Sequence, residues 1–239
     1  MNSIKSLLLL AIATLSAAAH AQPSPGTFSL IPRIGVTFAN VSNEGIVFSS
    51  TTNTSAVSGS KYREGFTGGV DLQYQATPIL AISAGVFYAR QGCKYKDTDL
   101  TGAVPESKYD VYSNCRLDLD YVQVPLRAHL YIAQGLSVNA GVQAGFLTNN
   151  NTHYEQSEVT INKDGSYTYT SEMTEHDTRS SLLRSFDFSI PIGISYEYAK
   201  VVLDFRYNIN LTKIYKDDLL GNDCKNRTFA LTVGYKLDL

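Results

Sequence analysis

The chain has 239 residues, of which 44% are hydrophobic and 18% are charged, with 16 Tyr, 17 Gly and no Trp. The formal net charge of −2 and the lack of a basic run exclude a nucleic-acid-binding protein, which needs a positively charged face. Beyond the N-terminus, no segment approaches the ~20 consecutive apolar residues of a membrane-spanning helix. One domain without spanning helices is therefore the starting expectation.

The N-terminus has the pattern of a secretory signal peptide. Lys5 supplies the positive charge, Leu7 to Leu15 the apolar region, and Ala19-His20-Ala21 the small-x-small cleavage site. A membrane anchor is the alternative, but the apolar run is shorter than the ~18 residues expected of a span. The sequence thus predicts a signal peptide over residues 1–21 and an exported domain over 22–239, in which disulfides can form.

Past residue 26 the apolar residues recur with a period of two, which indicates β-strands with two different faces. The alternation is clearest near the sixth predicted strand, where Ile190, Ile192 and Ile194 face away from Ser189 and Ser195. The predicted strands, in chain order, are residues 30–39, 66–74, 80–91, 122–131, 136–146, 186–197, 201–210 and 228–239. Pro125 and Pro191 each remove a backbone donor, so we expect local bulges in the fourth and sixth strands.

The connections between the predicted strands alternate in length. Three are tight turns, near Pro78, Gly135 and Lys200. The long polar connections are residues 40–63, 93–116, 149–184 and 212–226. This alternation is typical of an outer-membrane barrel with short periplasmic turns and long extracellular loops, so both termini are expected in the periplasm. Within the longest loop, Asp164-Gly165 is a hairpin signal that predicts a ribbon protruding above the membrane.

The two faces of the strands separate a soluble barrel from a membrane barrel. A lipocalin-like barrel would turn its apolar face inward, whereas a membrane barrel turns it toward lipid. The apolar face is nearly free of charge, and aromatic residues such as Tyr74, Tyr235, Phe66 and Phe186 gather at strand ends, as at membrane interfaces. The predicted fold is therefore all-β: an eight-stranded antiparallel up-and-down transmembrane β-barrel with long extracellular loops.

The inward face of this barrel carries charges of both signs. An eight-stranded barrel has an interior only wide enough for side chains to fill, and unpaired charges there would be costly. We therefore expect an ion network centred on Arg33, Asp71, Arg127 and Asp204 that plugs the lumen, although individual solvation by water is the alternative. The predicted lumen-facing polar residues are Arg33, Asp71, Arg127, His129, Asp187, Glu197, Asp204, Arg206 and Lys236.

The three cysteines of this exported chain are candidates for oxidation. Cys93 ends the third predicted strand and Cys115 precedes the fourth, so both flank one loop at about the same height. We expect a Cys93–Cys115 disulfide, although the sequence leaves every pairing open. Cys224 would then remain a lone thiol or form an intermolecular bond.

One segment carries a family resemblance. Asp120-Tyr121-Val122-Gln123-Val124-Pro125-Leu126 resembles the Tyr-x-(Glu/Gln)-(Ile/Val)-Pro-Leu element of the PorT-like outer-membrane β-barrel family of Bacteroidetes, and the ending from Phe229 to Leu239 is similar to that family's closing strand. The resemblance implies a small porin-like barrel in a Bacteroidetes-type outer membrane. It implies no particular activity.

The sequence shows no convincing catalytic, metal or cofactor set. His176 beside Asp177 is the one local candidate for acid–base chemistry, and a solvated loop explains it better. The leading hypothesis is a non-enzymatic protein, embedded in outer-membrane lipid, whose extracellular loops bind a surface ligand or another envelope protein. A narrow porin-like channel for small solutes is the alternative, followed by an envelope enzyme at the rim.

Overall fold

The computed structural model describes residues 24–42, 45–49, 54–101, 103–216 and 224–239. The predicted signal peptide, residues 1–21, lies outside the described residues, as do parts of the predicted loops 40–63 and 212–226. The strands are β1 (Phe28–Ser42), β2 (Gly45–Ser49), β3 (Thr54–Ser58), β4 (Ser60–Lys61), β5 (Arg63–Thr77), β6 (Leu80–Tyr95), β7 (Lys108–Ala133), β8 (Leu136–Ile161), β9 (Tyr167–Tyr169), β10 (Thr174–Thr178), β11 (Phe186–Tyr198), β12 (Val201–Asn210), β13 (Lys225–Tyr235) and β14 (Leu237–Asp238).

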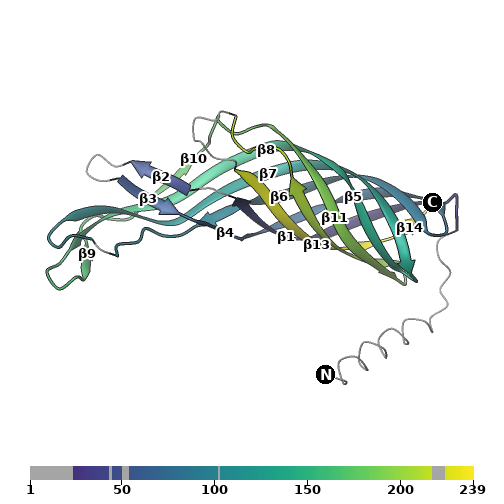
Figure 1. Ribbon diagram of the computed structural model, residues 1–239, viewed down its shortest axis with the longest axis horizontal. Helices are drawn as coiled ribbons and strands as arrows, with labels where there is room; N and C mark the ends of the chain where they lie inside the picture. Colours follow the sequence, from purple (N-terminus) through teal and green to yellow (C-terminus); the bar gives the residue numbers. More distant parts are fainter. Residues whose placement is uncertain (1–23, 43–44, 50–53, 102, 217–223) are drawn as a thin grey trace, which may run out of the picture.

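Eight of these strands close into an antiparallel ring, which confirms the predicted fold class (Figure 1). Around the ring the order is β1, β5, β6, β7, β8, β11, β12 and β13, and β13 pairs back with β1. The short strand β14 also pairs with β1. Outside the ring, β4 pairs with β6, β9 and β10 pair with β8, and β2 and β3 form a separate two-stranded sheet.

The ring has an apolar outside and a polar inside, the reverse of a soluble barrel. Along β12, Leu203 and Phe205 are 50% and 45% exposed, whereas the alternating Asp204 and Arg206 are 0% and 4% exposed. The same alternation of exposed apolar and buried polar residues recurs on the other ring strands. An outward apolar band around a polar interior is the arrangement that a lipid bilayer requires.

The two ends of the barrel differ, and we name them by their connections. At the turn end, tight turns join β5 to β6, β7 to β8 and β11 to β12, and the C-terminus lies there as well (Figure 1). Ala199 and Lys200 have φ of 47° and 70°, the positive values that two-residue hairpin turns use. Gly135 also has a positive φ, and a Cβ there would collide with the carbonyl oxygen of Glu197. At the opposite end, which we call the loop end, β7 and β8 extend beyond the other strands of the ring.

The expected bulges at Pro125 and Pro191 are not found. Pro125 pairs with Gln143 of β8 in an unbroken register, and Pro191 pairs with Asn208 of β12. On the other side of each proline the pairing is interrupted and resumes in the same register. Each proline therefore interrupts the hydrogen-bonded ladder on one side of its strand, and no extra residue is inserted as in a bulge. The register shifts of β7 lie elsewhere, between Ser113 and Arg116, at Asp120/Tyr121 and between Tyr131 and Ala133.

Two of the predicted long loops, 93–116 and 149–184, are strand over half or more of their length. β7 and β8 each have 26 residues, whereas a membrane-crossing strand needs only ~9–11. They pair with each other from Lys108 and Thr160 at the loop end down to Ala133 and Leu136 at the turn end. The predicted hairpin turn at Asp164-Gly165 is present, because Asn162 N donates to Ser166 O at 2.7 Å and Gly165 has a φ of 82°. The protruding ribbon thus includes β7 in addition to the strands that flank the turn.

Candidate functional site

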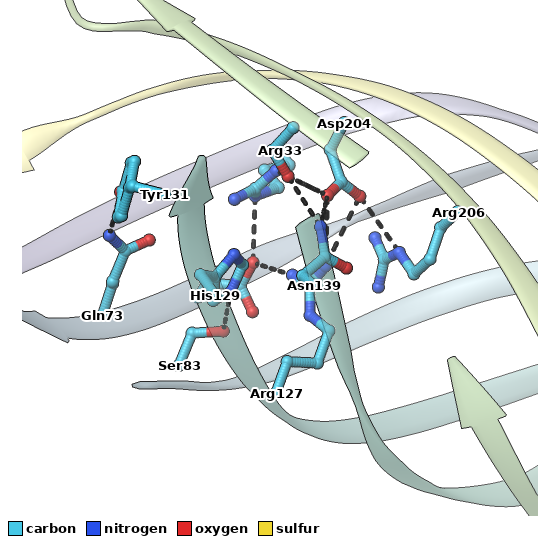
Figure 2. A network of polar contacts seen from close by, with 11 residues as sticks. Arg33, Gln73, Ser83, Arg127, His129, Tyr131, Asn139, Asp204 and Arg206 are labelled. Carbon is cyan, nitrogen blue, oxygen red and sulfur yellow. Dashed lines mark hydrogen bonds and ion pairs between the residues drawn. The ribbon is translucent and has the colours of Figure 1, made fainter. Parts of the chain in front are cut away.

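The centre of the lumen is an ion cluster of two carboxylates and three guanidinium groups (Figure 2). Asp71 Oδ2 on β5 lies 2.9 Å from Arg33 Nε on β1 and 2.7 Å from Arg127 Nη2 on β7. Asp204 Oδ2 on β12 lies 3.2 Å from Arg127 Nη1 and 3.7 Å from Arg33 Nη1. The Nε of Arg206 lies 3.1 Å from the other oxygen of Asp204. These contacts connect strands on different sides of the ring.

Neutral side chains complete the coordination of Asp204. The Ser195 hydroxyl donates to Asp204 Oδ2 at 2.6 Å, and Asn139 Nδ2 donates to the same oxygen at 3.4 Å and to Ser195 at 2.9 Å. The guanidinium of Arg206 also lies 5.4 Å from the ring centroid of Phe87. Because buried charges are tolerated only when paired and hydrogen-bonded, these contacts explain why so many ions share one narrow interior.

The other predicted lumen residues lie in separate small contacts. His129 contacts the hydroxyl of Ser83 at 2.9 Å, and Figure 2 shows this pair beside the ion cluster. Lys236 Nζ lies 2.9 Å from Glu197 Oε2, and Asp187 accepts a hydrogen bond from Asn210. The structure therefore brings Arg33, Asp71, Arg127, Asp204 and Arg206 together and does not bring the other four predicted residues into the same cluster.

A second, apolar layer lies on the loop-end side of the ion cluster. We call it the loop-end core. It consists of Val41, Cys93, Tyr95, Tyr112, Cys115, Leu117, Leu119, Tyr121, Leu183, Ile214 and Cys224, all buried. Sequence reasoning missed this layer because most of its residues fall in the four predicted long loops, 40–63, 93–116, 149–184 and 212–226. The available signal was the alternation of Leu117, Leu119 and Tyr121 with the acidic residues Asp118 and Asp120.

The predicted Cys93–Cys115 disulfide is wrong. No disulfide joins these two described residues. Cys93 is in register with Leu117, and Cys115 lies past the register shift of β7, where its thiol is 3.6 Å from the carbonyl oxygen of Ser113. Both cysteines and Cys224 are instead packed in the loop-end core, and burial raises the pKa of the Cys115 thiol to about 11.

At the loop end, β7, β8, β9 and β10 form a sheet that extends past the ring (Figure 1). We call it the loop-end sheet. On it, Asp177 contacts His153 Nδ1 at 3.1 Å rather than the adjacent His176, whose ring stacks on Tyr154 at 4.8 Å. Hydrogen bonds from Asn151 and His153 lower the pKa of the Asp177 carboxyl. His176 and Asp177 therefore do not form an acid–base pair, in line with the solvated-loop interpretation that the sequence favoured.

Charged pairs at the rim between ring and loop-end sheet were also missed by sequence reasoning. Arg63 Nη2 lies 2.9 Å from Asp118, and Arg90 Nε lies 2.8 Å from Asp120. The described part of the chain holds no group of three or more His, Cys, Asp or Glu residues arranged for a metal ion. No helix in that part is long and apolar enough to cross a membrane.

The ring, its apolar exterior and its polar lumen define a β-barrel of the bacterial outer membrane. Residues 20–216 match the family described as outer membrane protein beta-barrel domain, and the chain belongs to this family. A comparison with curated proteins gave no match.

Among solved structures, Ail, the attachment invasion locus protein of Yersinia pestis, is 14% identical, with a TM-score of 0.42 over 89% of this chain and 99% of Ail. The structure of Ail with the heparin analogue sucrose octasulfate gives 16% identity and the same TM-score and coverage. Neisserial surface protein A is 14% identical, with a TM-score of 0.36 over 87% of this chain and 96% of that protein.

Proposed function

We propose that the protein is a non-enzymatic surface binding or anchoring protein, and that the loop-end sheet contacts a ligand or another envelope protein. The observation that carries the proposal is an open sheet edge at β9. This strand pairs with β8 on one side, and no described strand pairs with its other side. An edge strand with unpaired backbone groups is a template for an added extended segment.

The hydrogen-bond pattern identifies which backbone groups face the open edge. Asn162 N donates to Ser166 O, and Thr170 N donates to Glu158 O. Because hydrogen-bonded pairs alternate along an antiparallel ladder, the intervening pair that bonds is Thr160 with Thr168. The N–H and C=O groups of Tyr167 and Tyr169 therefore point away from β8. Their side chains are 53% and 55% exposed, so a partner at this edge can contact both the backbone groups and the aromatic rings.

We also propose an orientation in the membrane. The loop end faces the cell exterior and both termini lie in the periplasm, as the signal-peptide pattern over residues 1–21 and the short turns favour. To test it, Ser166→Cys at the tip and Pro78→Cys at a tight turn are treated with a membrane-impermeant maleimide in intact cells. Labelling of the first variant alone is expected. Labelling of Pro78→Cys alone would place the turns outside.

Strand addition is tested with a photo-cross-linking amino acid at Thr168, which is exposed, in cells that produce the full chain. A discrete adduct with a partner is expected. It should disappear in Tyr169→Pro, which removes a donor from the open edge, and persist in Tyr169→Phe, which keeps that donor. An adduct that is absent at Thr168, or that survives Tyr169→Pro, would contradict binding at this edge. Protease-resistant barrel formation by each variant provides the folding control.

A further inference from the structure

A groove of about 580 Å³ runs over the lipid-facing surface of β1, β5 and β6 and reaches Val233 of β13. Its walls include Ile34 and Val36 of β1, Phe66 of β5 and Tyr88 of β6, and its floor lies at Gly68. Ile34, the partner of Gly68 on β1, and Phe66, two positions before Gly68 on β5, are 69% and 53% exposed, so these walls project outward beside a residue that has no side chain. The groove opens directly toward the hydrocarbon layer.

Gly68 creates the hollow without being required by the backbone. A Cβ at Gly68 would lie 3.6 Å from the carbonyl oxygen of Arg33 and 3.7 Å from Ile34 Cγ2, which are ordinary van der Waals distances. The neighbouring Gly35 and Gly69 differ, because a Cβ at either position would collide with backbone atoms of the adjacent strand. Glycine inside a strand is unfavourable, so its presence at a position with room for a side chain needs another reason.

The ring of Tyr88 does not fill the space above Gly68, although the two residues are directly paired across β5 and β6. Tyr88 instead stacks on Phe66 with ring centroids 5.1 Å apart, and its hydroxyl hydrogen-bonds Asp120. Both partners lie on the loop-end side of Gly68, so the ring leans that way and leaves the hollow open.

A cation lies at the loop-end limit of the groove. The guanidinium of Arg90 lies 5.5 Å from the ring centroid of Phe66, and its side chain is 36% exposed. Arg90 bonds Asp120 through Nε and Nη2, and Tyr88 is a further partner. A guanidinium has five N–H donors, so these contacts leave donors for an anionic group at the membrane interface.

We propose that this groove binds one phosphate-bearing membrane lipid, with an acyl chain over Gly68 between Ile34 and Phe66 and the phosphate on Arg90. Annular lipid covers any barrel, but only an acyl chain with an anionic end matches an apolar groove that ends at an exposed guanidinium. This lipid site lies on the ring and is independent of the loop-end sheet and of its binding role.

Native mass spectrometry of the purified barrel in a mild detergent with dioleoyl phosphatidylglycerol tests the proposal. We expect one retained lipid on the native chain, and about a tenfold lower occupancy in Gly68→Leu, whose side chain fills the hollow. Ala140→Leu, which adds the same side chain at an exposed position of β8, should retain the lipid. An adduct absent from the native chain, or equal in Gly68→Leu, would overturn the site. The mass of the lipid carried through purification from native membranes distinguishes a glycerophospholipid from lipid A.

The headgroup contact is tested by comparing phosphatidylglycerol with dioleoylglycerol, which has the same chains and no phosphate. The native chain should retain only the phosphate-bearing lipid. In the double variant Arg90→Gln/Asp120→Asn, which removes both charges of the pair, this preference should disappear. An unchanged preference, or equal retention of dioleoylglycerol by the native chain, refutes the role of Arg90.

Discussion

Asp204 is the residue on which most of the lumen contacts converge. It lies against three guanidinium groups and accepts hydrogen bonds from Ser195 and Asn139. Asp204→Asn keeps the shape of the side chain but leaves the three cations with Asp71 as their remaining carboxylate in the cluster. We expect a loss of about 3–5 kcal/mol in the free energy of unfolding, the usual result of breaking a buried ion pair.

The measurement is urea-induced unfolding in lipid vesicles. Gel mobility monitors the folded fraction, because the chain has no Trp whose fluorescence could report it. Glu64→Gln is the matched control, since it removes a carboxylate from the exposed pair with Lys94. It should leave the unfolding midpoint unchanged because exposed pairs contribute little. Equal midpoints for the two variants would show that the lumen ions are individually hydrated.

The raised pKa of Cys115 predicts an unreactive thiol. The thiolate is the reactive species, and a change in pKa from 9.0 to about 11 lowers its fraction at pH 8 by about a hundredfold. Iodoacetamide should therefore label Cys115 slowly in the folded barrel and rapidly after denaturation, as measured by peptide mapping. The rate should increase by about tenfold per pH unit below 11, the value at which half of the thiol is ionised, and level off above it. Rapid labelling at pH 8 in the folded barrel would mean that the loop-end core is open to solvent.

Residue parity along the strands was enough to place the charged residues in the lumen and to suggest the group Arg33, Asp71, Arg127 and Asp204, but not the individual contacts. That Arg127 bridges Asp71 and Asp204 depends on strand tilt and side-chain reach, neither of which the alternation reveals. His129 and Asp187 have the same inward parity as the cluster residues, yet they contact Ser83 and Asn210 instead. The cysteine pairing failed for a similar reason, because the register shift near Cys115 has no mark in the hydrophobic pattern.

At the scale of the strand, the apolar face of β11 should tolerate charge only outside the bilayer. Ile192 is 42% exposed and lies on the outward face of the ring. We expect Ile192→Arg to reduce the free energy of unfolding by roughly 2–4 kcal/mol if the residue lies near the bilayer midplane. The same gel-mobility assay measures the free energy of unfolding of this variant.

Met173, 52% exposed on the segment between β9 and β10, is the control for this substitution. Met173→Arg places the same cation on the loop-end sheet, where water solvates it, and should leave stability unchanged. A similar loss in both variants would indicate that bilayer depth does not determine the effect.

The membrane-crossing parts of the strands were predictable because one side of each faces lipid and the other faces the lumen. Toward the loop end the contrast is inverted, because Leu117 and Leu119 are buried there, and β7 continues to Lys108 through residues that read as a polar loop. There the strands are maintained by pairing with β8 and by the loop-end core rather than by lipid. Local sequence carries little information about such long-range pairing, so the length of the loop-end sheet could not be predicted.

The whole molecule should not conduct ions. The ion cluster and the loop-end core occupy two successive levels of the interior, and an eight-stranded barrel has room only for such side chains. Planar-bilayer recordings of the purified barrel should show no reproducible unit conductance, under conditions in which a larger porin gives clear steps. Stable unit events would favour the narrow channel instead.

The contacts that cross the lumen also have a consequence for how the barrel assembles. Arg127 of β7 meets Asp204 of β12, 77 positions later, and Asn226 of β13 donates to Gln91 of β6, 135 positions earlier. A partly inserted sheet that lacks β12 and β13 contains only one side of these two contacts and is not stabilised by them. Such non-local contacts slow folding because the chain must be ordered before they form. Assembly should therefore proceed with a late, cooperative step in which closure of β13 on β1 and formation of the interior occur together, without a stable half-barrel.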